Sequence, residues 1–139
     1  MTYLVERLAQ LRRYLDHLAR LRPKVRGPED LRSDLSLHND VLFSLLSVAQ
    51  LVIDMAGELA AQRAETFDDY TEAVRALAVY DEFPSELVEQ LARLPGFRNI
   101  VMHEYVKLDL ERAVEALDTL EPVEEFARIV ARILEAKAD

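Results

Sequence analysis

Residues 41–56 read VLFSLLSVAQLVIDMA, and this stretch decides the fold. Wound into a helix, it is apolar nearly all the way round, which is typical of a central helix that packs against neighbours on several sides. We expect the helix to begin after one of three candidate N-caps and to reach about Gln62. The candidate caps are Ser33, Asp34 and Ser36.

The segment before this stretch predicts an amphipathic helix. Its leucines are spaced three or four residues apart, so they fall on one stripe. The helix should end near Leu21, because Pro23, Gly27 and Pro28 interrupt the pattern that follows. The stripe consists of Leu4, Leu8, Leu11, Leu15 and Leu18.

The second half of the chain predicts shorter helices, separated by proline or by polar residues. A polar stretch at residues 63–69 precedes one short helix, and Pro84 fits the first turn of the next. Pro95-Gly96 should kink or break that helix, because proline lacks the amide hydrogen. Asp109 is a plausible N-cap for another helix, and Pro122 either kinks it or starts a further one.

The patterns together favour one class of fold. The sequence has no strand-like alternation of apolar and polar residues, no internal repeat and no long linker. Helices of this kind bury their apolar stripes by packing against each other. We therefore predict an all-α fold, an up-and-down helical bundle of five to six helices, in a single domain of residues 1–139.

Composition narrows the function classes. The 139 residues include no cysteine, which excludes thiolate metal sites and cysteine nucleophiles. The apolar run at residues 41–53 lies between Asp40 and Asp54 and is too short to span a bilayer, and no secretory signal is visible. We therefore expect a cytoplasmic protein with no membrane partner.

The formal net charge of −9 is unevenly distributed. Residues 1–32 hold eight basic and four acidic side chains, whereas the remaining 107 hold nine and 22. A positive patch for RNA would have to come from the first segment, or else these side chains are the solvated face of a helix. The candidates are Arg12, Arg13, Arg20, Arg22, Lys24 and Arg26.

Residues 96–105, GFRNIVMHEY, gather the side chains best suited to chemistry. A histidine titrates near neutrality, an arginine offers a planar fork for phosphate, and an asparagine can donate to an oxyanion. Five residues correspond to about 140° of rotation on a helix, so Arg98 and His103 do not share a narrow stripe, whereas Asn99 and His103 do. Arg98 and His103 converge on one phosphate only if the helix ends near His103 or a second subunit contributes.

Other catalytic signatures are missing from the sequence. It contains no Walker loop, no GxGxxG, no GxSxG and no HExxH motif, and its three histidines are scattered. We expect no metal and no cofactor. Asp54, an acid inside an apolar run, could orient an imidazole or hold Arg98, or it could lie exposed with Glu58 one turn away.

The string of residues 96–105 closely resembles the Arg-x4-His-x-Tyr motif of the HepT-like toxins, which belong to the HEPN superfamily of helical ribonucleases. Other segments resemble the family as well. Residues 51–56 (LVIDMA) look like its second-helix signature, residues 83–93 like the helix leading into the motif, and residues 106–126 like its closing segment. The resemblance covers roughly residues 33–134.

This resemblance implies a homodimer in which the two motifs face each other across the interface. It implies a metal-independent endoribonuclease, the toxin of a type II toxin–antitoxin system, with Arg98 and His103 as the catalytic pair and Asn99 and Asp54 as supporting residues. It also implies a nucleotidyltransferase antitoxin that transfers AMP to Tyr105. Two positions depart from the family pattern: Pro95 stands where members often continue helically, and Gly57 where asparagine is common.

Two other interpretations remain open. The chain could be a catalytically silent helical dimer that serves as binding partner or substrate of a nucleotidyltransferase, and the acidic balance favours this interpretation. It could also be a helical adaptor without a site, which leaves the clustered motif unexplained.

Overall fold

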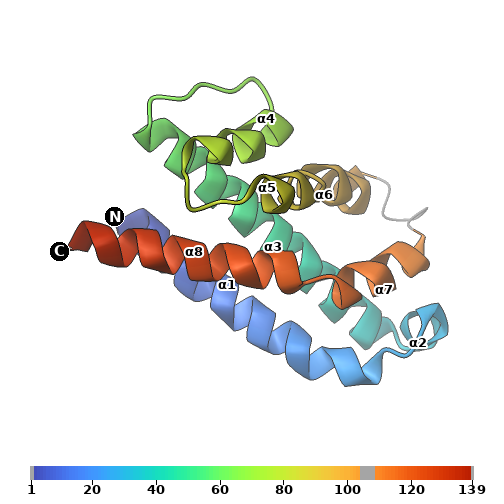
Figure 1. Ribbon diagram of the computed structural model, residues 1–139. Helices are drawn as coiled ribbons and strands as arrows, with labels where there is room; N and C mark the ends of the chain where they lie inside the picture. Colours follow the sequence, from blue (N-terminus) through green and yellow to red (C-terminus); the bar gives the residue numbers. More distant parts are fainter. Residues whose placement is uncertain (1, 104–108, 139) are drawn as a thin grey trace.

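The computed structural model describes residues 2–103 and 109–138, and these residues form helices and connecting turns without any strand. Figure 1 shows the helices crossing one another at several angles, with the start of α1 and the end of α8 on the same side. The buried apolar side chains form one contiguous core. The predicted all-α class is therefore confirmed.

Helix α3 (Leu35–Gln62) is the centre of the bundle. It packs against α1 (Thr2–Leu21), α2 (Pro28–Ser33), α4 (Tyr70–Arg75), α6 (Leu94–His103) and α7 (Leu110–Asp118). Among the described helices, α3 is long and apolar enough to cross a membrane by length and composition, but 56% of its most apolar window is buried in the protein. That burial is typical of a core helix, as the sequence predicted.

The start of α3 shows which candidate cap is used. The Asp34 side chain accepts a hydrogen bond from the Leu37 backbone N–H, so Asp34 is the N-cap. Such a bond satisfies one of the amide groups that the first turn of a helix leaves without a partner. The other end of α3 lies at Gln62, as predicted.

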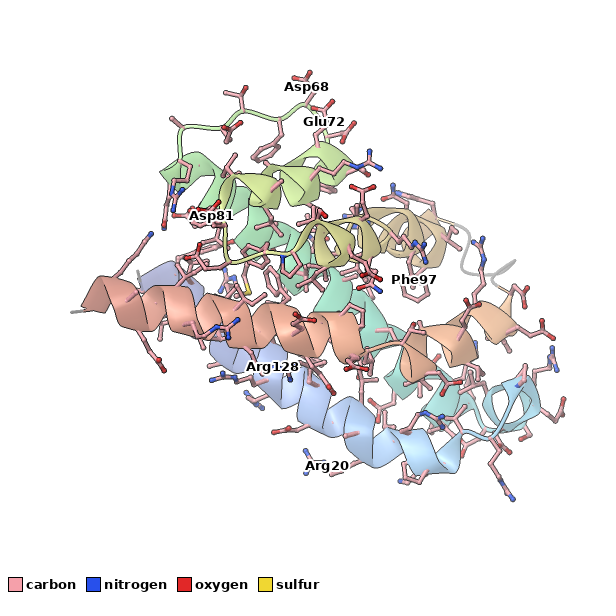
Figure 2. All side chains as sticks on the ribbon, in the orientation of Figure 1. Arg20, Asp68, Glu72, Asp81, Phe97 and Arg128 are labelled. Atoms are coloured by element: carbon pink, nitrogen blue, oxygen red, sulfur yellow. The ribbon has the colours of Figure 1, made fainter. Side chains whose placement is uncertain are left out.

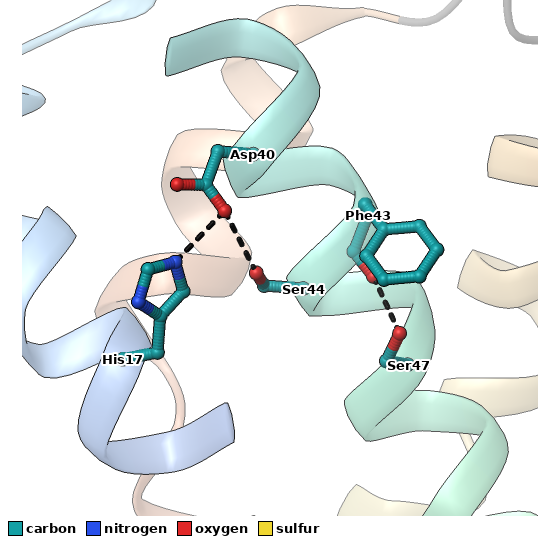
Figure 3. Close-up of polar contacts among 5 residues, drawn as sticks. All are labelled: His17, Asp40, Phe43, Ser44 and Ser47. Atoms are coloured by element: carbon teal, nitrogen blue, oxygen red, sulfur yellow. Dashed lines mark hydrogen bonds and ion pairs between the residues drawn. The ribbon is translucent and has the colours of Figure 1, made fainter. Parts of the chain in front are cut away.

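The leucine stripe of α1 faces the core, as the spacing predicted. Half-buried His17 joins α1 to α3, because its Nε2 lies 2.8 Å from Asp40 Oδ1. The Ser44 hydroxyl reaches the same oxygen at 3.4 Å (Figure 3). His17 is therefore a contact between helices, and the polar side of α1 is not wholly solvated.

The described residues form more helical segments than the predicted five to six. One reason is that the segment after α1 is not a plain loop. A 3-10 turn covers Arg22–Lys24, and Pro28 is the first residue of the short helix α2. Proline suits the first helical turn, where its missing amide would have no partner in any case. A second 3-10 turn, Ala76–Val79, extends α4.

Proline also acts at the start of helices farther along the chain. Pro84 is the N-cap of α5 (Ser85–Leu91), one position before the first turn where we expected it. The break predicted at Pro95-Gly96 falls upstream, at residues 92–93, and Pro95 lies in the first turn of α6. The motif therefore lies on a continuous helix as far as His103.

The C-terminal helices follow the predicted boundaries. Asp109 caps α7 by accepting from the Glu111 N–H. Pro122 does not kink α7, because it lies in the first turn of a new helix, α8 (Glu121–Ala138). Phe126 on α8 is fully buried and its ring centroid lies 5.8 Å from that of Phe83, so α8 closes the core.

Candidate functional site

The motif residues lie on α6, the helix that packs along α3. Val101 and Pro95 are buried and turn one side of α6 into the protein. Arg98 is half-buried, whereas Asn99 and His103 are exposed. The sequence therefore places a cation, an amide and an imidazole on one helix, with the amide and the imidazole exposed and the cation half-buried.

Arg98 is held by three side chains. Its Nε donates to Gln50 Oε1 at 2.9 Å, and its Nη1 donates to Asn99 Oδ1 at 3.0 Å. The guanidinium carbon also lies 5.5 Å from the centre of the Tyr70 ring, close enough for a cation–π attraction. These contacts come from α3, α6 and the start of α4, so the fold brings the neighbours of Arg98 together from three helices.

Asp54 is linked to Arg98 through an intermediate side chain. Its Oδ1 accepts from Gln50 Nε2 at 2.8 Å, and Gln50 in turn accepts from Arg98. The sequence suggested that Asp54 could hold Arg98. In the structure Gln50 bonds to both, and no hydrogen bond or ion pair between Asp54 and Arg98 is found among the described residues. Gln50 was missed, although a single amide four residues before Asp54 on the same helix was a signal that could have pointed to it.

His103 is separate from this chain of contacts. Among the described residues, no hydrogen bond or ion pair joins its ring to Arg98, Asn99 or Asp54. Tyr105 lies outside the described residues. Convergence of Arg98 and His103 on one phosphate therefore stays a prediction.

The N-terminal basic residues are partly engaged. Arg22 forms an ion pair with Asp118 of α7, and Arg26 forms one with Asp30 of α2. The others are exposed, and Arg13 and Arg20 border a shallow hollow beside His17. Figure 2 shows Arg20 extending away from α1. Ion pairs therefore neutralise two of the six residues of the predicted positive patch.

A groove of about 710 Å³ lies on the other side of α6. Its walls come from α3, α5, α6, α7 and the start of α8, and they include Phe97 and Ile100. Figure 2 shows Phe97 extending from α6 toward α7. Since Arg98 and His103 do not line this groove, it is distinct from the polar cluster. Within the described residues, no group of three His, Asp or Glu side chains is placed to hold a metal ion.

The fold and the site together define a class of protein: a helical bundle that carries a fixed guanidinium and an exposed imidazole on one helix. Comparison with known proteins is more specific. Residues 6–130 match the family model described as Ribonuclease HepT-like. The chain belongs to this family.

One relative supports the assignment at the level of sequence. The chain is 32% identical over 120 residues, or 84% of its length, to a protein of Archaeoglobus fulgidus described as "Putative RNase". The aligned region covers 89% of that relative, so the similarity extends over nearly the whole of both chains.

Several solved structures match the fold, including two from toxin–antitoxin complexes. The first is a tri-AMPylated HEPN toxin of Shewanella oneidensis in complex with an MNT antitoxin, with a TM-score of 0.80, 21% identity and coverage of 93% of this chain and 96% of that one. The second is a toxin–antitoxin pair with AMP-PNP, with a TM-score of 0.78, 20% identity and coverage of 91% and 96%. At such identity these matches show a shared fold alone.

Proposed function

We propose that this protein is the toxin of a type II toxin–antitoxin system and that it is a metal-independent endoribonuclease. Membership of the Ribonuclease HepT-like family supports an action on RNA. The solved HEPN toxin of the same fold supports a nucleotidyltransferase antitoxin as partner, because that protein is AMPylated and bound to an MNT antitoxin. A cellular RNA substrate and such a partner favour the cytoplasm as the site of the reaction.

The observation that supports this function most is the pair of hydrogen bonds that fixes the Arg98 side chain. The guanidinium has five N–H groups, and two of them donate to Gln50 and Asn99. The other three make no hydrogen bond to a described residue. A permanently charged guanidinium with three unused N–H donors is suited to bind the phosphate of an RNA backbone.

The chemistry needs no metal. A general base takes the proton from the 2′-hydroxyl, and the 2′ oxygen attacks the adjacent phosphorus while the bond to the 5′ oxygen breaks. A general acid protonates that leaving oxygen, so the products carry a 2′,3′-cyclic phosphate and a 5′-hydroxyl. His103 fills either proton-transfer role, Arg98 stabilises the charge on the phosphorane, and Asn99 supports Arg98.

A homodimer completes the site. One copy offers one imidazole, whereas the reaction needs both a base and an acid. In a dimer of two 1–139 domains whose α6 helices face each other, the second His103 supplies the missing group. Exposure of Asn99 and His103 in the single chain is consistent with such a shared site.

Tyr105 is the proposed point of control. It follows His103 by two positions, so an AMP group on its hydroxyl would add a phosphate beside the catalytic pair. That anion would pair with Arg98 and occupy the place of the RNA phosphate. Protein made together with its nucleotidyltransferase should carry one or more AMP units on Tyr105 and should be inactive, and the Tyr105→Phe variant should escape silencing.

The test is RNA cleavage by the purified protein in EDTA, comparing wild type with Arg98→Ala and His103→Ala. Arg93→Ala is the matched control, because Arg93 is exposed and borders the groove on the other side of α6. We expect both motif variants to lose cleavage and the control to keep it. If the unmodified wild type cleaves no RNA but accepts AMP, the chain is the silent partner of a nucleotidyltransferase, which its acidic charge also suits.

A further inference from the structure

The structure contains a relay of three side chains that ends at Arg98. Asp54 accepts from Gln50 at 2.8 Å, and Gln50 accepts from Arg98 at 2.9 Å. Asp54 and Gln50 lie four residues apart on α3, so they are neighbours on one side of that helix. All three side chains are half-buried, which limits competition from water.

The direction of the relay follows from hydrogen-bonding chemistry. An ionised carboxylate only accepts, and a guanidinium only donates. The Gln50 amide can satisfy both only with its NH2 toward Asp54 and its oxygen toward Arg98. The flipped amide would place its oxygen against the carboxylate oxygen and its NH2 against the guanidinium N–H. Asp54 therefore selects the orientation in which Gln50 can hold Arg98.

The two hydrogen bonds that Arg98 makes determine which of its N–H groups remain for a ligand. Gln50 takes the Nε–H and Asn99 takes one hydrogen of Nη1, while the Tyr70 ring lies near the guanidinium. Both hydrogens of Nη2 are left without a hydrogen-bond partner among the described residues. The held guanidinium thus offers one defined edge to a ligand.

We propose that Gln50 is a positioning residue for Arg98, locked in its orientation by Asp54, and that the relay presents the Nη2 edge to a phosphodiester. The choice of ligand rests on the proposed ribonuclease function, whereas the hold on Arg98 does not. A long arginine side chain that is fixed in advance loses less freedom when it meets its ligand. Because Arg98 meets the charge that develops on the phosphorane, its fixed position should favour the catalytic step more than substrate affinity.

The first experiment observes Arg98 directly. In 15N-labelled protein, solvent exchange of the Arg98 Nε–H is measured by NMR for wild type, Gln50→Leu and the control Gln90→Leu. Gln90 is exposed on α5 and borders the groove on the other side of α6. We expect Gln50→Leu to speed exchange roughly tenfold, as for loss of one hydrogen bond of about 1.4 kcal/mol, and Gln90→Leu to leave it unchanged. Equal exchange in wild type and Gln50→Leu would overturn the proposal.

A pair of variants tests the role of Asp54. Asp54→Leu removes the acceptor of the Gln50 NH2, so the amide is no longer held with its oxygen toward Arg98. In Asp54→Asn the side-chain oxygen at position 54 can still accept from Gln50. The Asp54→Asn variant should therefore keep the protection of the Arg98 Nε–H that Asp54→Leu loses. If the two variants behave alike, Asp54 has no locking role.

The second readout is RNA cleavage by the same proteins. We expect Gln50→Leu to lower kcat roughly 10- to 100-fold, as for loss of one charge-assisted hydrogen bond, with a smaller change in KM. Asp54→Asn should keep most of kcat and Asp54→Leu should lose it, a difference that follows from the acceptor at position 54. Unchanged kcat in Gln50→Leu would contradict the proposal. If wild type itself does not cleave RNA, the proposed ribonuclease function is wrong. The exchange measurements then still show whether Gln50 and Asp54 fix Arg98.

Discussion

Arg98 and His103 differ in how the protein surrounds them. Arg98 bonds to Gln50 and Asn99 and is half-buried, whereas His103 is exposed and makes no hydrogen bond to those neighbours. A substitution at Arg98 therefore breaks a network, while His103 can be removed at little cost to the fold. For that reason His103 is the cleaner position at which to separate chemistry from stability.

Tyr80 is a buried residue whose polar group contributes to stability. Its hydroxyl donates to the Leu59 carbonyl at 2.6 Å, near the end of α3. Tyr80→Phe removes that donor and should lower the free energy of unfolding by about 1–2 kcal/mol. Urea denaturation measures the change. Tyr3→Phe, at an exposed site, should change it by less than about 0.5 kcal/mol, and equal effects would refute this account.

The same tyrosine predicts a pH dependence. Burial raises the pKa of Tyr80 above its ordinary value of 10.0. A group whose pKa is higher in the folded state stabilises the fold below the unfolded pKa and loses that effect as pH rises further. The loss should come above about pH 10, so stability should fall there more steeply in wild type than in Tyr80→Phe. Denaturation midpoints between about pH 8 and about pH 11 would show this, and parallel curves would contradict it.

At the scale of elements, Gly96 offers a test of α6. It lies in the first turn of the helix, and a Cβ placed there would meet nothing within 4 Å. Its backbone does not require a positive φ. Gly96→Ala should stabilise the protein by about 0.5–1 kcal/mol and leave RNA cleavage unchanged. A lower thermal midpoint or lost cleavage would show that the motif needs glycine itself.

The helices could be predicted where one signal was strong. The apolar run in α3, the leucine stripe of α1 and the caps Asp34 and Asp109 all agreed with the structure, because burial and capping act over a few residues. Breaks at proline were harder to place. Pro28 is the first residue of its helix and Pro95 the second, because a proline early in the first turn loses no hydrogen bond.

The candidate site was only partly predictable for the same kind of reason. Arg98, Asn99 and His103 are close in sequence, so one motif marks them. Gln50 lies 48 residues before Arg98, and only the packing of α6 on α3 brings the two together. A contact of that separation leaves no local pattern in the sequence. Asp54 was noticed because a carboxylate in an apolar run needs a partner, but its direct partner, Gln50, was not identified.

At the scale of the whole molecule, the main prediction concerns how two chains assemble. The proposed chemistry needs two imidazoles, so the active form should be a homodimer with twice the chain mass of 15.9 kDa. Sedimentation equilibrium at micromolar concentration should return that mass. A species of 15.9 kDa alone would contradict the dimer and the shared site.

The measurement that tests the central claim most directly is the chemistry of the RNA ends left by the purified protein in EDTA. We predict products with 2′,3′-cyclic phosphate and 5′-hydroxyl ends from wild type, and no products from a His103→Ala variant that melts at the wild-type temperature. Cleavage that stops when metal is chelated, products with 5′-phosphate ends, or a His103→Ala variant that still cleaves would contradict the account.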